Sequence, residues 1–382
     1  MSETIFSLAT ARGRAGVAII RVSGPDAVLA AEQLCGSVPA SRGVREIRAQ
    51  DGSVIDEALL LNFPVGKSFT GEKVVEFQCH GSVVVIDRVL DELAQIPGLR
   101  MSLPGEFTRR AFENGRLDLA QVEGLADLID AETEAQRAQA VRVLSGALGD
   151  RAEIWRNKLI RAAALLEVTI DFADEEVPVD VTPEVCELIS SVAGRDAAIT
   201  SEIAGTTRDV IEVRMDIAGL PVTFLDTAGL REAEDEVERI GIKRAIDRAE
   251  AADLRLFLGD LPEIEVKARE GDIYIAAKSD LTGIGVSGLT GEGVDALLQK
   301  IAQELSSRVQ NAGLVIRQRQ KQAVNRANAH LETAVHALQV DLGPEIVALE
   351  LRSALHELNI LIGRVDVENL LGEIFASFCI GK

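Results

Sequence analysis

The chain has 382 residues, a formal net charge of −21 at pH 7, and a composition that is 47% hydrophobic, 26% charged and 3% aromatic. This length exceeds what one hydrophobic core usually holds, so two or three soluble globular domains are expected. The acidic balance argues against phosphate-driven nucleic-acid binding over the whole surface, although a local basic patch is compatible with it. No apolar stretch approaches the roughly 20 residues of a membrane-spanning helix, and the start of the sequence lacks the pattern of a signal peptide.

Four scattered cysteines, Cys35, Cys79, Cys186 and Cys379, show no metal-ligand or CxxC spacing. We therefore expect a cytoplasmic protein with reduced thiols. Cys379 lies three residues from the end of the chain. It is either a reactive thiol or a small buried residue that anchors the tail, and the other three cysteines are interpreted as structural.

Residues 1–118 are predicted to form a mixed α/β domain. Runs of β-branched residues at 17–22, 74–77 and 83–86 predict strands, and turn signals such as Ser23-Gly24-Pro25 separate them. From about residue 119 the apolar residues change to helical spacing. Residues 119–185 are therefore predicted to form the first part of a helical domain, which the acidic, Pro-containing stretch 171–183 interrupts.

Residues 186–306 return to an alternation of strands and helices. Strands are expected at 222–225, 254–258 and 273–276, with a helix starting at Glu236. This order favours a parallel, doubly wound sheet. After about residue 307 the chain is helical again, so the pattern indicates an α/β domain inserted into a helical one. The apolar face of this last helical part comprises Val347, Leu351, Leu355, Leu358 and Ile362.

Three short motifs in the inserted region predict a guanine-nucleotide switch. Asp-Thr-Ala-Gly at 226–229 directly follows an apolar strand, where a carboxylate can hold Mg²⁺ through water and the glycine lets the backbone approach a phosphate. Upstream, 205–209 reads Gly-Thr-Thr-Arg-Asp and offers a Thr hydroxyl that can join and leave the Mg²⁺ shell. Downstream, Asp280 can accept two hydrogen bonds from a guanine edge, and 287–289 resembles the loop that closes over the base. Together the motifs predict a domain that binds GTP or GDP.

A GTP-binding domain also needs a phosphate loop of the form G-x-x-x-x-G-K-[ST] before these motifs, and the sequence contains none there. The Gly-Lys-Ser at 66–68 is a decoy, because Leu61 stands where the first glycine is required and the site lies in the wrong domain. Residues 182–185 run directly into 188–196, which resemble the helix that normally follows the loop. In the base-reading motif, Ala277 also stands where asparagine is expected.

Two interpretations of the missing loop remain open. Either the domain has lost it, or the sequence joins ordered segments between which flexible loops of the natural chain are left out. We favour the second, because a degenerate domain has little reason to keep all three motifs. Phosphate and switch loops without nucleotide are also segments that are expected to lack order.

Longer runs around these motifs resemble the MnmE (TrmE) family of tRNA-modifying GTPases. They occur in the GTPase region, in the N-terminal domain and at the C-terminus, so the resemblance covers nearly the whole chain. The runs are 193–199, 203–209, 226–232 and 237–242 in the GTPase region, 21–25, 68–72, 104–108 and 114–121 in the N-terminal domain, and Phe-Cys-Ile-Gly-Lys at 378–382.

The resemblance implies a Ras-like, doubly wound GTPase domain (186–306) inserted in an all-α helical domain (119–185 and 307–382) that ends in the Cys-Ile-Gly-Lys tail. An α/β domain that binds tetrahydrofolate and dimerises (1–118) precedes them. It further implies a homodimer that works with the flavoprotein MnmG (GidA), without a membrane, to add a carboxymethylaminomethyl or related group at C5 of the wobble uridine of tRNAs. In this reading 5-formyl- or methylene-tetrahydrofolate supplies the one-carbon unit. The resemblance also implies that GTP hydrolysis requires Mg²⁺, K⁺ and contact between two GTPase domains.

Several site residues follow from the resemblance by position. Ser201, Ile203 and Thr206 would bind K⁺, Thr207 would bind Mg²⁺, and Glu238 would orient the attacking water. A cation at the domain interface can stabilise charge as an arginine finger does elsewhere. The family's potassium-binding Asn belongs to the absent loop and has no counterpart. The implied GTP-binding set is Ser201, Glu202, Ile203, Ala204, Gly205, Thr206, Thr207, Asp226, Thr227, Ala228, Gly229, Lys278, Asp280, Ser287, Gly288 and Leu289.

For folate, the matching positions are Arg21, Glu76, Arg116 and the terminal Lys382. Two or three of the cations can hold the glutamate tail of folate, while Glu76 can pair with the donor edge of the pterin. Arg116 stands where the family usually has Lys. The plainer alternative is that Arg21 and Arg116 only form surface ion pairs. By the same resemblance, Cys379 is a candidate catalytic thiol near the folate.

Two other classes of protein stay open. A ribosome-assembly GTPase of the related Era/Der group shares the switch motifs but lacks the N-terminal folate-like domain and the C-terminal tail. A scaffold without GTPase activity would bind only folate, tRNA or MnmG. A G-x-x-x-x-G-K-[ST] segment between Val185 and Leu188 of the physical protein would distinguish the scaffold from the enzyme.

Overall fold

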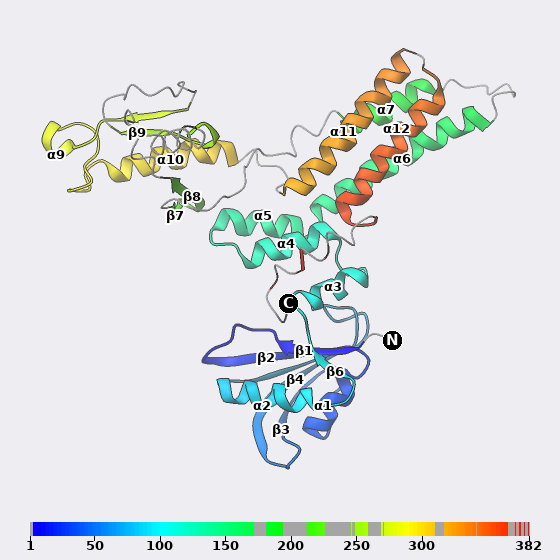
Figure 1. Cartoon of the computed structure of the whole chain (residues 1–382), viewed down its shortest axis with the longest axis vertical. Coiled ribbons are helices and arrows are strands. Elements are labelled where there is room, and N and C mark those ends of the chain that lie inside the picture. The colour runs from blue at the N-terminus through cyan, green and yellow to red at the C-terminus, as the bar shows by residue number, and fades with distance from the viewer. Residues whose placement is uncertain are drawn as a thin grey trace, which may run out of the picture. The chain divides into compact units, whose positions relative to one another are not determined.

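A computed structural model describes two compact units, one built from residues 1–126 and 359–382 and the other from residues 127–358. The described residues are 3–171, 181–193, 212–225, 246, 249–258, 269, 271–309, 317–340 and 342–365, together with 371, 374, 375, 378 and 381. Figure 1 shows the elements of each unit. Within the described ranges, no helix combines the length and the apolar character needed to cross a membrane.

The first unit is built on a six-stranded sheet with the order β3-β4-β5-β2-β1-β6. Neighbouring strands are antiparallel except for β1 and β6, which run parallel. The strands predicted at 17–22 and 74–77 lie in β2 and β5 and are confirmed. The strands are β1 (Thr4–Leu8), β2 (Ala15–Ser23), β3 (Arg42–Arg48), β4 (Val54–Phe63), β5 (Val74–Gly81) and β6 (Leu99–Met101).

Helices α1 (Ala27–Cys35) and α2 (Val83–Ala94) cover one face of this sheet. Alternate strand residues such as Ile20 and Phe77 point into that face and are fully buried with both helices. The prediction of a strand at 83–86 is wrong, because these residues begin α2. Ile86, Val89 and Leu93 are buried at helical spacing, and burial of that stripe outweighs the strand preference of the β-branched run.

Helices α3 (Glu106–Glu113) and α4 (Leu119–Ile129) follow, and described residues near the end of the chain pack beside them. Phe375 and Phe378 are 4% and 7% exposed and share a hydrophobic cluster with Leu119 and Val122. The cluster joins the C-terminal end of the chain to the N-terminal unit. Residues more than 250 positions apart in the sequence therefore form one core.

The helical part of the second unit contains α5 (Glu134–Leu144), α6 (Ala147–Asp171), α7 (Thr182–Ala193), α11 (Gln318–Gln339) and most of α12 (Pro344–Ile362), whose last four residues belong to the first unit. Helix α7 packs on both α6 and α11, which belong to the predicted helical domain. The predicted domain boundary at 185 therefore falls inside α7. The predicted apolar face of the last helical part is formed by α12, where Val347, Leu351 and Leu358 are buried.

The α/β part of the second unit contains β7 (Glu212–Ile217), β8 (Leu220–Leu225), β9 (Leu256–Leu258), β10 (Ile273–Ile275), α9 (Ser279–Thr282) and α10 (Val294–Val309). The strands predicted at 222–225, 254–258 and 273–276 correspond to β8, β9 and β10. Strands β9 and β10 are parallel, as predicted, whereas β7 and β8 form an antiparallel pair. Ile217, Ile273 and Ile301 form one cluster that both strand pairs share with α10.

Candidate functional site

The face of the N-terminal sheet opposite α1 and α2 carries an ion pair. Arg21 on β2 and Glu76 on β5 are direct partners in the strand ladder, and Arg21 Nε donates to Glu76 Oε1 at 2.8 Å. The guanidinium carbon lies 5.8 Å from the ring centre of Phe69 and 5.6 Å from that of Phe107. Both charged side chains retain some exposure, 20% for Arg21 and 13% for Glu76. This arrangement offers a cation, a carboxylate and aromatic surface within one small area.

Arg116 is exposed and lies near this area through the loop that joins β4 to β5. Its aliphatic carbons lie beside Gly71, since a Cβ added there would meet Arg116 Cγ at 3.3 Å. Asn114 Nδ2 donates to the Thr70 carbonyl at 2.7 Å and ties the same loop to the segment after α3. The loop carries Phe69, so the structure connects Arg116 with the aromatic side of the Arg21 pair.

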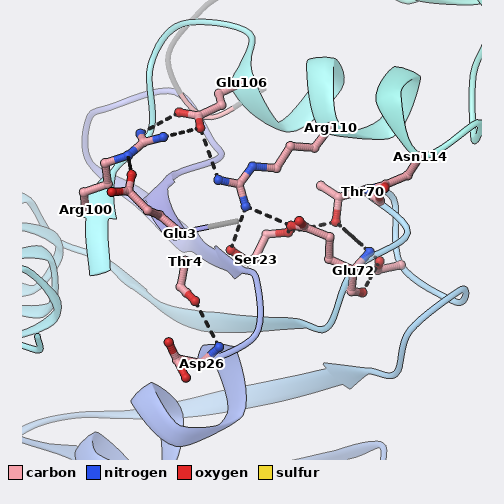
Figure 2. Close-up of polar contacts among 11 residues, drawn as sticks. Glu3, Thr4, Ser23, Asp26, Thr70, Glu72, Arg100, Glu106, Arg110 and Asn114 are labelled. Carbon is pink, nitrogen blue, oxygen red and sulfur yellow. Dashed lines mark hydrogen bonds and ion pairs between the residues drawn. The ribbon is translucent and has the colours of Figure 1, made fainter. Parts of the chain in front are cut away.

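A buried network of charged side chains holds this loop on helix α3 (Figure 2). Arg110 on α3 is 9% exposed and donates to Glu72 Oε2 at 3.0 Å and to Glu106 Oε1 at 3.2 Å. The Ser23 hydroxyl also donates to Glu72 Oε2, at 2.7 Å. The network therefore fixes β2, the β4–β5 loop and α3 relative to one another around the Arg21–Glu76 pair.

Glu106 connects this network to β6 and to the start of the chain (Figure 2). Arg100 donates to both oxygens of Glu106, at 2.8 and 2.6 Å, and also to Glu3. Burial raises the pKa of the Glu106 carboxyl, but hydrogen bonds from Arg100 and from the Leu103 N–H outweigh it and lower the pKa overall. Glu106 is thus held ionised inside the fold.

The sequence identified these network residues only as parts of family-like runs. Ser23, Thr70, Glu72 and Glu106 carry no individual prediction, because nothing in a single sequence shows that distant polar residues converge. One feature of the sequence could have indicated the network. In α3 two charged residues, Glu106 and Arg110, lie on the same buried face as Phe107. Charged residues on the inner face of a helix indicate buried pairing rather than a solvated surface.

In the second unit, the predicted base-reading residues come together at one edge of the β9–β10 pair. The Ser287 hydroxyl is fully buried and donates to Asp280 Oδ1 at 2.6 Å. The backbone N–H groups of Leu289 and Thr290 donate to the same hydroxyl oxygen, each at 3.2 Å. Asp280 itself is exposed, so Ser287 orients a carboxylate that can accept donors from solvent or from a ligand.

The backbone on either side of Asp280 has a defined conformation. Ala277 forms a parallel bridge with Val286, and Lys278 adopts a left-handed conformation with φ 62° and ψ 48°. Leu289 is 86% exposed, and the space around Gly288 is open. An unhindered apolar side chain beside an oriented carboxylate is compatible with a planar, hydrogen-bonding ligand.

An ion pair supports this edge from the other end of the strands. Arg255, just before β9, donates to both carboxylate oxygens of Asp272, at 2.8 and 2.6 Å. The two side chains are 7% and 2% exposed. Burial raises the pKa of Asp272, but hydrogen bonds from Arg255 and the Arg269 N–H lower it overall. The pair fixes the parallel register that places Asp280 after β10.

The other predicted site residues lie outside the described part of the chain, and their roles stay predictions. In the decoy Gly-Lys-Ser, Ser68 is buried and donates to the Glu72 carbonyl at 2.6 Å, which is a structural role. The predicted residues outside the described ranges are Ser201, Glu202, Ile203, Ala204, Gly205, Thr206, Thr207, Asp226, Thr227, Ala228, Gly229, Glu238, Cys379 and Lys382.

Family models match almost the whole chain. Residues 4–116 match the model described as "GTP-binding protein TrmE N-terminus", and residues 119–379 match the "MnmE helical domain". The chain belongs to the MnmE family. The N-terminal match contains the Arg21–Glu76 pair and the Arg110 network.

Relatives within the MnmE family align over their full length. The chain is 55% identical to the tRNA modification GTPase MnmE of Roseobacter denitrificans and 51% identical to that of Ruegeria sp. (strain TM1040), with 100% of each chain covered. A more distant MnmE, from Parvibaculum lavamentivorans, is 44% identical with the same coverage. The alignment with the Roseobacter protein runs over 429 positions, which exceeds the 382 residues of this chain. That relative therefore contains residues that have no counterpart here.

Proposed function

We propose that this chain is a cytoplasmic GTPase that acts in tRNA modification. The observation that carries the proposal is the full-length match, at 55% identity, to a protein named tRNA modification GTPase MnmE. In this proposal the chain forms a homodimer and works with the flavoprotein MnmG (GidA) on the wobble uridine of tRNAs. The proposed domains are those predicted from the sequence, with the GTPase domain inserted in the helical one.

The proposed folate site centres on Arg21 and Glu76, and their geometry revises how they would act. From the sequence, two or three of the cations Arg21, Arg116 and Lys382 are expected to hold the glutamate tail of folate, and Glu76 is expected to pair with the pterin. Since Arg21 and Glu76 are joined at 2.8 Å, both would contact the same end of a bound ligand in this proposal. Glu76 suits the donor edge of a pterin, and Phe69 and Phe107 suit its flat faces.

The glutamate tail would then be held by other cations. Arg116 is exposed and, among the described residues, forms no ion pair, so its guanidinium is available for a carboxylate. The terminal Lys382 is the second candidate. A 5-formyl- or methylene-tetrahydrofolate bound here would supply the one-carbon unit, and Cys379 stays a candidate thiol for that chemistry.

Folate binding tests this site directly. Replacing Arg21 by Met removes the cation but keeps side-chain bulk, and we expect the Kd for 5-formyltetrahydrofolate to rise by about tenfold or more, as for loss of a charge-assisted contact. Arg12→Met is the matched control, because Arg12 is 59% exposed and its ion pair within the described part of the chain is with the exposed Asp87. The affinities are measured by equilibrium dialysis. Equal affinity for both variants and the parent protein would show that Arg21 does not belong to the folate site.

The proposed GTP site uses the oriented Asp280 for the base. In the proposal Lys278, Ser287, Gly288 and Leu289 complete the base pocket, and the Asp-Thr-Ala-Gly and Gly-Thr-Thr-Arg-Asp motifs serve the phosphates and Mg²⁺. Thr207 would bind Mg²⁺, and Ser201, Ile203 and Thr206 would bind K⁺. Glu238 would orient the attacking water, and K⁺ would stabilise negative charge as two GTPase domains meet.

One observation favours a second candidate, a scaffold without GTPase activity. The sequence contains no G-x-x-x-x-G-K-[ST] segment ahead of the switch motifs, and no side chain can replace its row of phosphate-binding amides. The intact mass of the natural protein separates the two candidates. A mass well above 40.9 kDa means that further residues exist and supports the enzyme, whereas a mass of 40.9 kDa supports the scaffold.

The ribosome-assembly alternative is the weakest. The N-terminal match over residues 4–116 covers a domain that such GTPases lack. Binding of 5-formyltetrahydrofolate by this protein would argue against it independently.

A further inference from the structure

A chain of buried hydroxyl groups ties the β4–β5 loop to strand β2 (Figure 2). The side-chain oxygens of Ser23 and Thr70 lie 2.8 Å apart, and the Ser23 hydroxyl donates its proton to Glu72 Oε2 at 2.7 Å. Because a hydroxyl has only one proton, the Thr70 hydroxyl is the donor to Ser23. The bonds therefore run in one direction, from Thr70 through Ser23 to the carboxylate of Glu72. Arg110 pairs with the same carboxylate at 3.0 Å.

The other polar groups of Thr70 hold the loop as well. Its hydroxyl oxygen accepts the Glu72 N–H at 3.3 Å, and its carbonyl accepts Asn114 Nδ2 at 2.7 Å. Thr70 is fully buried, so water does not compete for these bonds. Valine has the shape of threonine without the hydroxyl. A valine at this position would therefore leave the Ser23 oxygen and the Glu72 N–H without their bonds to the loop.

Phe69 is exposed between two buried residues of this loop. Ser68 and Thr70 are 3% and 0% exposed, whereas Phe69 is 37% exposed. The Ser68 hydroxyl donates to the Glu72 carbonyl at 2.6 Å, so the loop is anchored on both sides of Phe69. The ring centre of Phe69 lies 5.8 Å from the guanidinium carbon of Arg21. A flat ligand that binds to a ring held in this way loses little free energy to ordering of the side chain.

The hydroxyl chain and the candidate folate site share strand β2. Arg21 and Ser23 are two residues apart on this strand, so their side chains lie on the same face of the sheet. The bond from Thr70 to Ser23 thus fixes the loop against the strand that carries Arg21. We propose that Thr70 is a positioning residue, which through Ser23 holds Phe69 as one wall of the site for the pterin ring. This proposal rests on the folate-binding function proposed above.

The test measures the Kd for 5-formyltetrahydrofolate in the full chain by equilibrium dialysis. Thr70→Val removes the hydroxyl, Thr70→Ser keeps it, and Phe69→Ala removes the ring itself. Thr108→Val is the matched control. Thr108 is also fully buried in this unit, but its hydroxyl has no hydrogen-bond partner in the described part of the chain. Hydrogen–deuterium exchange of the peptide 64–73 reports whether the loop is held.

We expect Thr70→Val and Phe69→Ala each to raise the Kd about tenfold, the loss typical of one aromatic contact. Thr70→Ser and Thr108→Val should stay within about twofold of the parent protein. The double variant Thr70→Val with Phe69→Ala should bind no more weakly than Phe69→Ala alone, because Thr70 acts through that ring. A general loss of structure would add its own effect instead. Thr70→Val should also exchange the loop peptide about tenfold faster.

Three outcomes would contradict this proposal. Unchanged exchange of the loop in Thr70→Val overturns the anchor. Faster exchange with unchanged folate affinity, or additive losses in the double variant, overturns the positioning role. If the parent protein binds no folate, the proposed function fails and the positioning role fails with it, while the exchange data still decide whether Thr70 holds the loop.

Discussion

Arg110 offers the sharpest test of how the N-terminal domain is held together. Its guanidinium lies between the carboxylates of Glu72 and Glu106, and all three side chains are largely buried, with exposures of 9%, 16% and 10%. Replacing Arg110 by Met keeps the apolar stem of the side chain and removes the charge. Glu72 then loses its cation, while Glu106 keeps Arg100 as a partner.

The magnitude follows from the burial of the pair. Removing one partner of a buried ion pair costs about 3–5 kcal/mol, because the remaining charge stays desolvated and unpaired. Arg109 is the adjacent residue on the same helix and pairs with Glu113, but these side chains are 53% and 50% exposed. Its replacement by Met should cost no more than about 0.5 kcal/mol, as is typical of exposed pairs on a helix.

The stability of this unit is measured by urea titration, with hydrogen exchange of peptides from β2 and β5 as the readout. Fluorescence is unsuitable, because the single tryptophan, Trp155, lies in α6 of the other unit. The expected result is a large loss for Arg110→Met and almost none for Arg109→Met. Equal losses for the two variants would show that the buried network does not hold the domain, and the argument from burial would fail.

Further predictions concern the tail, acid stability and the base-reading loop. Phe378→Ala should lower the unfolding free energy of the N-terminal unit by about 3 kcal/mol, as for other buried aromatics, in the same exchange assay; an unchanged value would contradict the observed cluster. The pKa of Glu106 is lowered from its ordinary value of 4.5, so its contribution to stability is present above pH 4.5 and is lost as the pH falls through the lower folded value. Glu106→Gln should therefore flatten the acid side of a stability-versus-pH curve, and an unaltered slope would refute the assignment. Ser287→Ala should weaken GTP binding by about tenfold, since Asp280 loses its orienting donor; the exposed Thr290→Ala is the control, and equal affinities would exclude the role.

Much of the fold could be predicted because local patterns determine it. The strands at 17–22 and 74–77 are runs rich in β-branched residues, and α12 shows a clear apolar stripe. The prediction at 83–86 is wrong because β-branched residues favour strands intrinsically, whereas burial at Ile86, Val89 and Leu93 favours a helix. Tertiary packing decided between the two.

The candidate site was predictable only in part. Resemblance selected Arg21 and Glu76, and strand register brings them together, but no local pattern specifies that their charges pair. The bond between Thr70 and Ser23 joins the β4–β5 loop to a strand 47 positions earlier in the chain. Such contacts follow from the folded topology and leave no periodic signal in the sequence.

The measurement that tests the central claim most directly is GTP turnover by the purified natural protein in K⁺ and in Na⁺. Our account predicts hydrolysis that requires Mg²⁺ and falls sharply when Na⁺ replaces K⁺, because the cation stabilises charge at the interface of two GTPase domains. Hydrolysis at equal rates in both salts would contradict the potassium site. No hydrolysis in either salt would contradict the GTPase itself and leave the folate-binding scaffold.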